Sequence, residues 1–280
     1  MRATSQIDIE SLVKTKLPPL PGSVIKISDL LQNVNAAPRD IADAIGCDPM
    51  LAARILRLAN SPVYARSRSI TTLSQAVVAV GNKAIYEMVM IGATTDVFGK
   101  EIYSSKIGRA NWEHSIAVAI IARELCNLLK MRGTEEAFVC GLLHDIGKIL
   151  LLRHDSKLYT ELHDSTEVND LPEKEKEIYG FDHAQLGALA AHRWGLPEPL
   201  CHMILNHHNP AKAEQALFMT YVTNVADGLT DLKICGLEVA NHNGFLRAES
   251  LETLRLSFGQ LEEIWEKAAP SLQEIIKTFA

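Results

Sequence analysis

A His-Asp dipeptide, His144-Asp145, lies inside a largely apolar stretch of this 280-residue sequence, from Phe138 to Leu152. An ionised carboxylate among apolar side chains is costly unless it is paired, hydrogen-bonded or bound to a metal ion. The dipeptide therefore predicts one of three arrangements: a salt bridge, a catalytic dyad or a metal site. Further ligands elsewhere in the sequence would favour the metal site over the other two.

Other histidines and aspartates occupy positions on predicted helices from which they would point inward. His114, for example, shares a helical face with Ile107, Val118 and Ile121, at offsets of seven, four and seven residues. Helices that are bundled around a centre can aim such side chains at one point. The resulting candidate metal ligands are His114, His144, Asp145, His183, His207, His208 and Asp227.

The types of these side chains indicate which metals they would hold. Five imidazoles and two carboxylates suit iron, manganese or zinc better than calcium or magnesium, which prefer shells of oxygen atoms. Seven side chains exceed what one ion usually needs, so the set fits two ions bridged by a carboxylate, with Asp145 as the natural bridge. A two-metal centre could hold a hydroxide as nucleophile and clamp a phosphoryl oxygen.

The same residues also fit a simpler interpretation. A single histidine on an apolar helical face, such as His114, is more often a hydrogen-bonded core residue than a ligand, and His207-His208 would suit a polar helix end. Composition and spacing alone therefore support a metal site and a buried hydrogen-bond network about equally.

The elements that would position these residues are predicted to be helices. The long segments show apolar residues at three-to-four spacing and none shows sustained apolar-polar alternation, so the predicted fold class is all-α. Cap signals place about five short helices in the first hundred residues, and a long helix follows over about Ser104 to Leu129. All ten histidines lie at or beyond residue 114. The chemistry is therefore expected beyond a boundary near Phe98-Gly99-Lys100.

The overall composition is ordinary for a globular protein, with 47% hydrophobic and 22% charged residues. A net charge of −6 and an isoelectric point near 5.9 argue against a nucleic-acid surface, which needs clustered Lys and Arg. The N-terminus has no apolar core of a signal peptide, and the longest apolar runs fall far short of a membrane span. The five cysteines show no C-x-x-C spacing, so neither a disulfide framework nor a thiolate zinc site is indicated. We expect a cytoplasmic protein with no nucleic-acid or membrane partner.

Several motifs occur in an order that is typical of one known family. They are Leu17-Pro-Pro-Leu-Pro21, Asp48-Pro49 through Asn60-Ser61, Ile70 to Gly81, Trp112-x-His114-Ser115, Gly141-Leu-Leu-His144-Asp145-Ile-Gly147, Asp182-His183-x-x-x-Gly187, Trp194-Gly-Leu-Pro197 and His207-His208-x-Pro210. Over about residues 15 to 212 this series closely resembles the HDOD family of bacterial signalling domains. The resemblance implies a helical fold related to the metal-dependent HD phosphohydrolases. It also implies a non-enzymatic regulatory module that has lost part of the metal site.

The second half of the sequence is also similar to the HD-GYP cyclic-dinucleotide phosphodiesterases, and it keeps more of their metal site than the HDOD resemblance implies. Lys148 matches the lysine that follows their His-Asp pair and would meet a phosphate, so Asp145 and Lys148 are the catalytic candidates. After His208 the sequence continues Asn-Pro-Ala-Lys-Ala-Glu-Gln and lacks the Gly-Tyr-Pro loop, which argues against cyclic-di-GMP hydrolysis. By this resemblance one metal would take His114, His144, Asp145 and Asp227, and the other Asp145, His183, His207 and His208.

The resemblance also suggests a division of the chain into three parts. We predict an N-terminal HDOD helical subdomain over residues 1–100, packed on an HD-type helical bundle. The bundle, over residues 101–232, would hold the metal ligands. Residues 233–280 would form C-terminal helices packed on the bundle.

Two functions from different classes follow from these observations. The first is an HDOD signalling module that binds one or two transition-metal ions, iron or manganese with zinc also suitable, and acts through a signalling-protein partner or a small phosphorylated ligand. The alternative is a metal-dependent phosphohydrolase that acts on a nucleotide or another phosphoester through a metal-bound hydroxide. A metal-free scaffold is a third interpretation, and cyclic-dinucleotide sensing without hydrolysis stays open.

Overall fold

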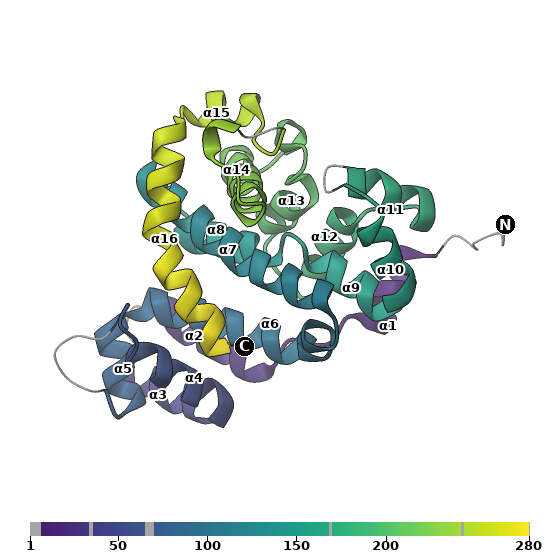
Figure 1. Cartoon of the computed structure of the whole chain (residues 1–280). Helices are drawn as coiled ribbons and strands as arrows, with labels where there is room; N and C mark the ends of the chain where they lie inside the picture. Colours follow the sequence, from purple (N-terminus) through teal and green to yellow (C-terminus); the bar gives the residue numbers. More distant parts are fainter. Residues whose placement is uncertain (1–6, 34–35, 65–69, 168–169, 242–243, 280) are drawn as a thin grey trace. The chain divides into compact units, whose positions relative to one another are not determined.

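The computed structural model of the chain describes residues 7–33, 36–64, 70–167, 170–241 and 244–279. Within these residues every regular element is a helix (Figure 1), so the predicted all-α fold class is confirmed. The chain divides into two compact units. The first combines Met1–Pro18 with Lys100–Trp265, and the second combines Pro19–Gly99 with Glu266–Ala280.

The second unit consists mainly of short helices with strong local start and stop signals. Its helices are α2 (Gly22–Gln32), α3 (Pro38–Gly46), α4 (Pro49–Ala59), α5 (Leu73–Val80), most of α6 (Asn82–Ser104) and the end of α16 (Phe258–Phe279). Asp48 caps α4, since its carboxylate accepts hydrogen bonds from the backbone N–H groups of Met50 and Leu51. Thr72 caps α5, and Gly81, with a φ of 85°, ends it.

The first unit is a helical bundle that holds every predicted site residue. Its helices are α1 (Ile9–Lys16), the end of α6, α7 (Lys106–Leu128), α8 (Thr134–Leu143), α9 (Ile146–His154), α10 (Ser156–Asp164), α11 (Leu171–Tyr179), α12 (His183–Arg193), α13 (Glu198–Asn206), α14 (Leu217–Ile234), α15 (Ala248–Leu254) and the start of α16, with short 3-10 turns η2 (Pro210–Lys212) and η3 (Val239–Asn241). The long helix α7 is buried along most of its length and packs chiefly on α8 and α14. The helix α12 packs chiefly on α9 and α13. The site residues are therefore carried by the most extensively packed helices of this unit.

The segment that carries the His-Asp pair is not one continuous helix. The helix α8 ends at Leu143 and α9 begins at Ile146, so His144 and Asp145 lie at the break. Asp145 has a φ of −101° and a ψ of 11°, outside the helical region. Adjacent side chains in an uninterrupted helix do not face each other, and the break allows these two to approach the same point.

The two compact units group the terminal segments of the chain by their contacts, and the predicted division into three parts stays a prediction. The segment Met1–Pro18 is grouped with the first unit and the segment Glu266–Ala280 with the second. The indole of Trp194 donates to the carbonyl of Pro18 at 2.8 Å, which fixes the N-terminal segment. The guanidinium of Arg54 lies 5.4 Å from the ring centre of Phe279, a cation–π contact in the second unit. Both contacts join residues that are far apart in the sequence. The spacing of apolar residues within one helix does not predict such contacts.

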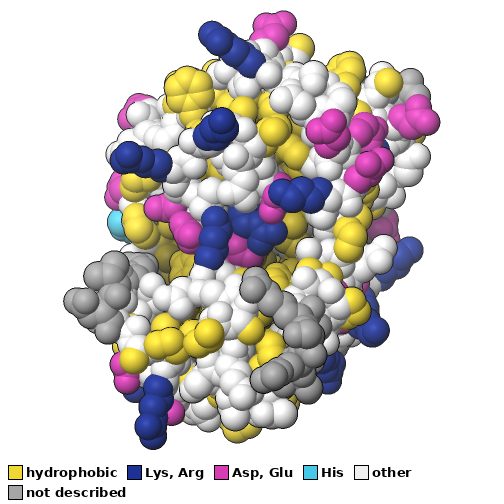
Figure 2. Space-filling model, turned by 90° about the vertical axis from the view of Figure 1, so that its left-hand side faces the viewer, with side chains coloured by type: hydrophobic (Ala, Val, Ile, Leu, Met, Phe, Trp, Pro, Cys, Tyr) yellow, Lys and Arg dark blue, Asp and Glu magenta, His cyan; other side chains and the backbone are white. Residues whose placement is uncertain are grey.

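The surface carries charges of both signs. On the face shown in Figure 2, Lys and Arg side chains are intermixed with Asp and Glu. Among the described residues, no single helix is both long and apolar enough to cross a membrane. Within the same residues, α5 and α6 taken together have sufficient length and apolar composition, but they are bent by 116° at their junction.

Candidate metal centre

Two glycines bring the His144-Asp145 break close to its neighbouring helices. A Cβ atom on Gly141 would lie 2.7 Å from the Cα atom of Ala119 on α7. A Cβ atom on Gly147 would lie 2.0 Å from the carbonyl oxygen of His183, at the start of α12. No side chain fits at such distances, so glycine at these two positions allows the break to lie directly between α7 and α12.

One half of the cluster consists of His114, His144 and Asp227. Nε2 of His114 lies 3.0 Å from Oδ1 of Asp227, and Nε2 of His144 lies 3.5 Å from the same oxygen. One ligand atom from each of the three residues lies within 4.8 Å of the other two. The three residues come from α7, from the α8–α9 break and from α14, as the predicted convergence of separate helices requires.

The other half of the cluster consists of His183, His207 and His208, whose ligand atoms also lie within 4.8 Å of one another. Nε2 of His183 lies 2.8 Å from Nε2 of His208, and the ring centres of His207 and His208 are 3.9 Å apart. The helix α13 ends at Asn206. Both adjacent histidines therefore lie in the turn after the helix, where their side chains can converge.

Asp145 lies between the two halves. Its Oδ2 atom is 3.4 Å from Nε2 of His144 and 3.8 Å from Nε2 of His114. Its Oδ1 atom is 3.3 Å from Nε2 of His183 and 3.8 Å from Nε2 of His207. Each carboxylate oxygen thus faces one half of the cluster, which is the geometry that the predicted bridging role requires.

Several ligand atoms at the centre are buried without a hydrogen-bond partner. The Nδ1 atoms of His144 and His207 lie 2.7 Å and 2.6 Å from the carbonyl oxygens of Gly141 and Ile204 and donate to them, which directs Nε2 toward the centre. Within the described residues, neither Nε2 atom nor Oδ1 of Asp145 has a hydrogen-bond partner. An unpartnered buried polar atom costs about 1–3 kcal/mol. Three at one place, with nitrogen and oxygen donors, fit a transition-metal ion.

The centre combines ionised carboxylates with imidazoles of different charge. Burial, together with the positive charge of His144, lowers the pKa of His207 to about 4, so this ring is neutral. Burial would also lower the pKa of His144, but the carboxylates of Asp145 and Asp227 outweigh it and raise the pKa to about 10. The proton on His144 thus partly neutralises the negative charge of Asp145 and Asp227. A bound cation would neutralise the same charge in its place.

Lys148 also balances the charge of Asp145. Its Nζ atom lies 2.6 Å from Oδ2 of Asp145, and both side chains are buried. Burial opposes a charged ammonium, but Asp145 and Asp227 raise the pKa of Lys148 above its ordinary value. The predicted contact of Lys148 with a phosphate stays a prediction.

Two acidic residues beside the cluster were not predicted from the sequence. Glu175 is fully buried on α11 and accepts hydrogen bonds from the Tyr159 hydroxyl at 2.6 Å, and from the backbone N–H and Nδ1 of His183 at 2.7 Å and 2.6 Å. Asp231 lies 3.3 Å from Nδ1 of His114. Asp231 follows the predicted ligand Asp227 by one helical turn, so helical periodicity could have found it. Glu175 lies in a charged segment that is typical of a surface helix, and only the tertiary structure reveals its role.

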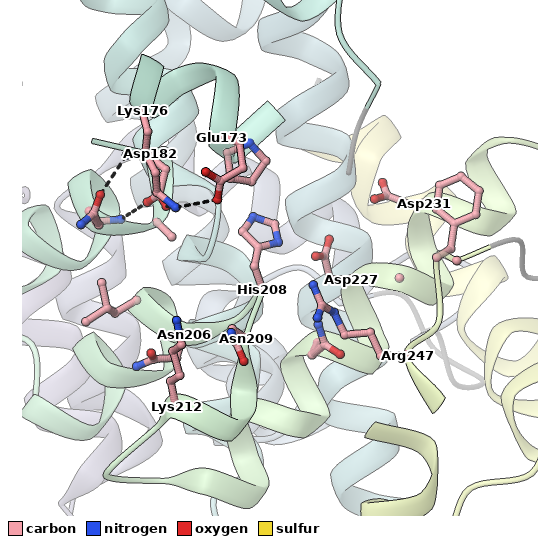
Figure 3. A pocket seen from close by; sticks show the side chains of 18 residues that line it. Glu173, Lys176, Asp182, Asn206, His208, Asn209, Lys212, Asp227, Asp231 and Arg247 are labelled. Atoms are coloured by element: carbon pink, nitrogen blue, oxygen red, sulfur yellow. Dashed lines mark hydrogen bonds and ion pairs between the residues drawn. The ribbon is translucent and has the colours of Figure 1, made fainter. Parts of the chain in front are cut away.

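A cavity of about 720 Å³ leads to the cluster. Figure 3 shows His208 near its middle, with Asp227 beside it and polar side chains around both. Lys148 is not among the described residues that line the cavity. Small-molecule sites commonly enclose about 300–1,000 Å³, so the cluster is open to a ligand of metabolite size.

Sequence comparisons identify relatives of different lengths. An uncharacterised protein of Treponema pallidum is 24% identical over 264 residues, which cover 89% of this chain and 50% of that protein. Ribonuclease Y of Thermus thermophilus is 27% identical over 203 residues, which cover 70% of this chain and 30% of the enzyme. The chain thus spans half, or less, of the length of these relatives.

Two solved structures match nearly the whole chain at 25% identity. One is a Shewanella amazonensis SB2B protein that is provisionally named a phosphohydrolase, with a TM-score of 0.78 and coverage of 99% of this chain and 100% of that one. The other is an HDOD domain protein of unknown function from Geobacter sulfurreducens, with a TM-score of 0.76 and coverage of 97% and 98%. The HDOD domain model itself matches residues 17–210. Since this match covers more than half of the sequence, the chain belongs to the HDOD domain family.

Proposed function

We propose that the seven clustered residues hold one or two divalent transition-metal ions, and that this centre hydrolyses a phosphoester. The observation that carries the proposal is the set of three buried ligand atoms without hydrogen-bond partners, Nε2 of His144, Nε2 of His207 and Oδ1 of Asp145. One or two bound cations would satisfy all three. The cavity that ends at His208 and Asp227 supports access by a small substrate.

In this proposal the residues divide between two ions that share Asp145. One ion would be held by His114, His144, Asp145 and Asp227, and the other would be held by Asp145, His183, His207 and His208. Bound metal ions neutralise phosphoryl oxygens and lower the pKa of water. Lys148, charged and next to Asp145, adds a positive charge for the phosphoryl group. Iron and manganese suit this mixture of nitrogen and oxygen donors, as does zinc.

Metal content is the first measurement. The chain is purified without a histidine tag, and iron, manganese and zinc are determined by elemental analysis. We expect between one and two equivalents in total. Less than about a tenth of an equivalent would contradict the metal proposal, because a tight site retains its ion.

Hydrolysis is measured separately, with p-nitrophenyl phosphate, nucleotides and cyclic dinucleotides in the presence of Mn²⁺ or Fe²⁺. We expect Asp145→Asn and His144→Ala to lower turnover at least about 100-fold, which corresponds to about 2.7 kcal/mol in the barrier. His192→Ala is the matched control, because this histidine is exposed on α12, outside the cluster. Turnover that is unchanged in both cluster variants would remove the enzyme proposal.

A second candidate function is a regulatory module that binds the metal and a phosphorylated ligand without turnover. The position of Lys148 favours it, because the lysine is paired with Asp145 and does not line the cavity among the described residues. Metal and ligand binding with no hydrolysis would select this function. A signalling-protein partner and a cytoplasmic location belong to the same proposal.

Ribonuclease Y is among the relatives of this chain, so RNA is a further substrate to test. The net charge of −6 and the mixed charges on the face in Figure 2 argue against tight binding of a polyanion by this chain. A single-stranded oligoribonucleotide therefore belongs in the hydrolysis panel, and we expect no cleavage of it.

A further inference from the structure

Cationic side chains line the cavity in addition to residues of the candidate metal site. Lys176 lines the cavity but is already paired with two carboxylates. Its Nζ atom lies 3.1 Å from Oε1 of Glu173 and 3.1 Å from Oδ2 of Asp182. Lys212 and Arg247 line the same cavity. In the described part of the chain, neither of these two side chains has a carboxylate within 4.0 Å.

The backbone at Arg247 is held firmly beside the cluster. A Cβ atom on Gly228 of α14 would lie 2.1 Å from the carbonyl oxygen of Phe245, so the chain just before Arg247 packs directly on the residue after Asp227. Arg247 is the N-cap residue of α15, and its side chain makes no capping hydrogen bond. It is therefore available to a ligand, and Figure 3 shows it extending toward the part of the cavity where Asp227 lies.

Two buried hydrogen bonds link this helix start to the ligand turn. The Ser250 hydroxyl donates to Oδ1 of Asn224 at 2.6 Å, and Nδ2 of Asn224 donates to the carbonyl of His207 at 2.8 Å. Ser250 is fully buried. Lys212 ends η2, four residues after His208. Both unpaired cations are thus carried by segments that are fixed relative to the histidines of the cluster.

An unpaired guanidinium and ammonium in a cavity favour an anionic group of a ligand, because charge-assisted hydrogen bonds to phosphate or carboxylate are strong and Arg binds them in a bidentate manner. Under the proposed function, on which this inference rests, the reacting phosphoryl group binds at the end of the cavity that is lined by His208 and Asp227. We infer that the ligand is a small phosphoester with a second, separate anionic group, and that Arg247 and Lys212 bind this second group. Arg247 and Lys212 both lie beyond the HDOD match at residues 17–210.

The inference is tested by binding alone, with ligands that cannot be hydrolysed. Alkylphosphonates are compared with α,ω-alkane bisphosphonates of three to six carbons, by titration calorimetry on the full chain with Mn²⁺. We expect at least one bisphosphonate to bind about tenfold or more tightly than its matched monophosphonate. Equal affinities across the series would overturn the inference.

Variants assign the preference to residues. Arg247→Gln and Lys212→Gln should each reduce it at least about threefold, and the double variant should abolish it. Lys176→Gln, which removes a cation that is already paired, should leave it intact. A preference that survives in the double variant would overturn the inference. Lys212 is exposed and Arg247 makes no capping bond, so these variants are expected to fold, and circular dichroism melting checks this.

The outcome is independent of hydrolysis. Turnover of p-nitrophenyl phosphate without a bisphosphonate preference would contradict only the inference about Arg247 and Lys212. A bisphosphonate preference without any turnover would support the inference and contradict only the hydrolytic function.

Discussion

The orientation of three histidines in the cluster depends on what the outer ring nitrogen of each one contacts. For His144 and His207 this contact is a carbonyl of the same helical turn, Gly141 and Ile204. For His183 it is the carboxylate of Glu175, which comes from another helix and is itself held by Tyr159. A buried carboxylate in that position fixes the orientation of the ring. It also makes the nitrogen that points into the cluster more basic, and therefore a stronger metal ligand. Glu175 is therefore a positioning residue for the candidate metal site.

Glu175→Gln should weaken metal binding by about 10–100-fold, because the amide removes the negative charge and cannot accept all three hydrogen bonds. The affinity for Mn²⁺ or Zn²⁺ is measured by competition with a chelating dye. Tyr159→Phe keeps the contact between Glu175 and His183, and its effect should be smaller.

Glu177→Gln is the matched control for this prediction. Glu177 lies on the same helix and, among the described residues, pairs only with Lys174. Because this pair is exposed to solvent, it contributes little to stability. Equal metal affinities of Glu175→Gln and Glu177→Gln would contradict the positioning role.

At the scale of the elements, close backbone contacts bring the ligands together. Gly141 lets α8 approach α7, and Gly147 lets the start of α9 approach the start of α12. These glycines flank the break that carries His144 and Asp145, so the two helix contacts and the ligand geometry depend on each other. Any side chain at either position must separate a pair of helices.

Gly147→Ala should lower the stability by about 1–3 kcal/mol, because its Cβ atom would overlap the carbonyl of His183 and the backbone must move. A decrease in the melting temperature of about 2–4 °C per kcal/mol is the expected result. The affinity for Mn²⁺ should decrease as well, since Asp145 and His183 move apart.

Gly259→Ala serves as the comparison. A Cβ atom at Gly259, on α16, would meet nothing within 4 Å, and alanine favours a helix by about 1 kcal/mol over glycine. The melting temperature should therefore stay the same or rise. A Gly147→Ala variant as stable as the unchanged chain would show that the close contact is not required.

At the scale of the whole molecule, all seven clustered residues belong to one compact unit, which combines residues 1–18 with residues 100–265. Ligand binding to the native state stabilises the part that binds it, by about 2.7 kcal/mol at a concentration 100 times the dissociation constant. The second unit, with α2 to α5, contributes none of these residues.

Addition of Mn²⁺ should therefore slow hydrogen exchange in α7, α8, α9, α12 and α14, while α2 to α5 change little. Mass spectrometry of deuterated peptides measures both regions in one experiment. Asp227→Asn, which removes a charge from one half of the cluster, should reduce the effect. Equal protection of both units, or protection confined to α2–α5, would contradict the assignment of the metal to this cluster.

Much of the fold and the identity of the clustered residues could be predicted from the sequence alone. Helices follow from the spacing of apolar residues, and caps such as Asp48 and Thr72 act within a few residues of themselves. The seven His and Asp residues were predicted to converge, and the structure brings them together. Their role as metal ligands, and that of Lys148 as a phosphate contact, stays a prediction.

Other features were decided only by the tertiary structure. The helix break at His144-Asp145, the buried contact of Glu175 with His183, the cavity and the place of Arg247 on it all depend on contacts between separate elements. The sequence contains a continuous apolar pattern through the break and a charged, surface-like pattern around Glu175. Local patterns report the preferences of one helix, whereas burial and partners are set by the other helices that pack against it.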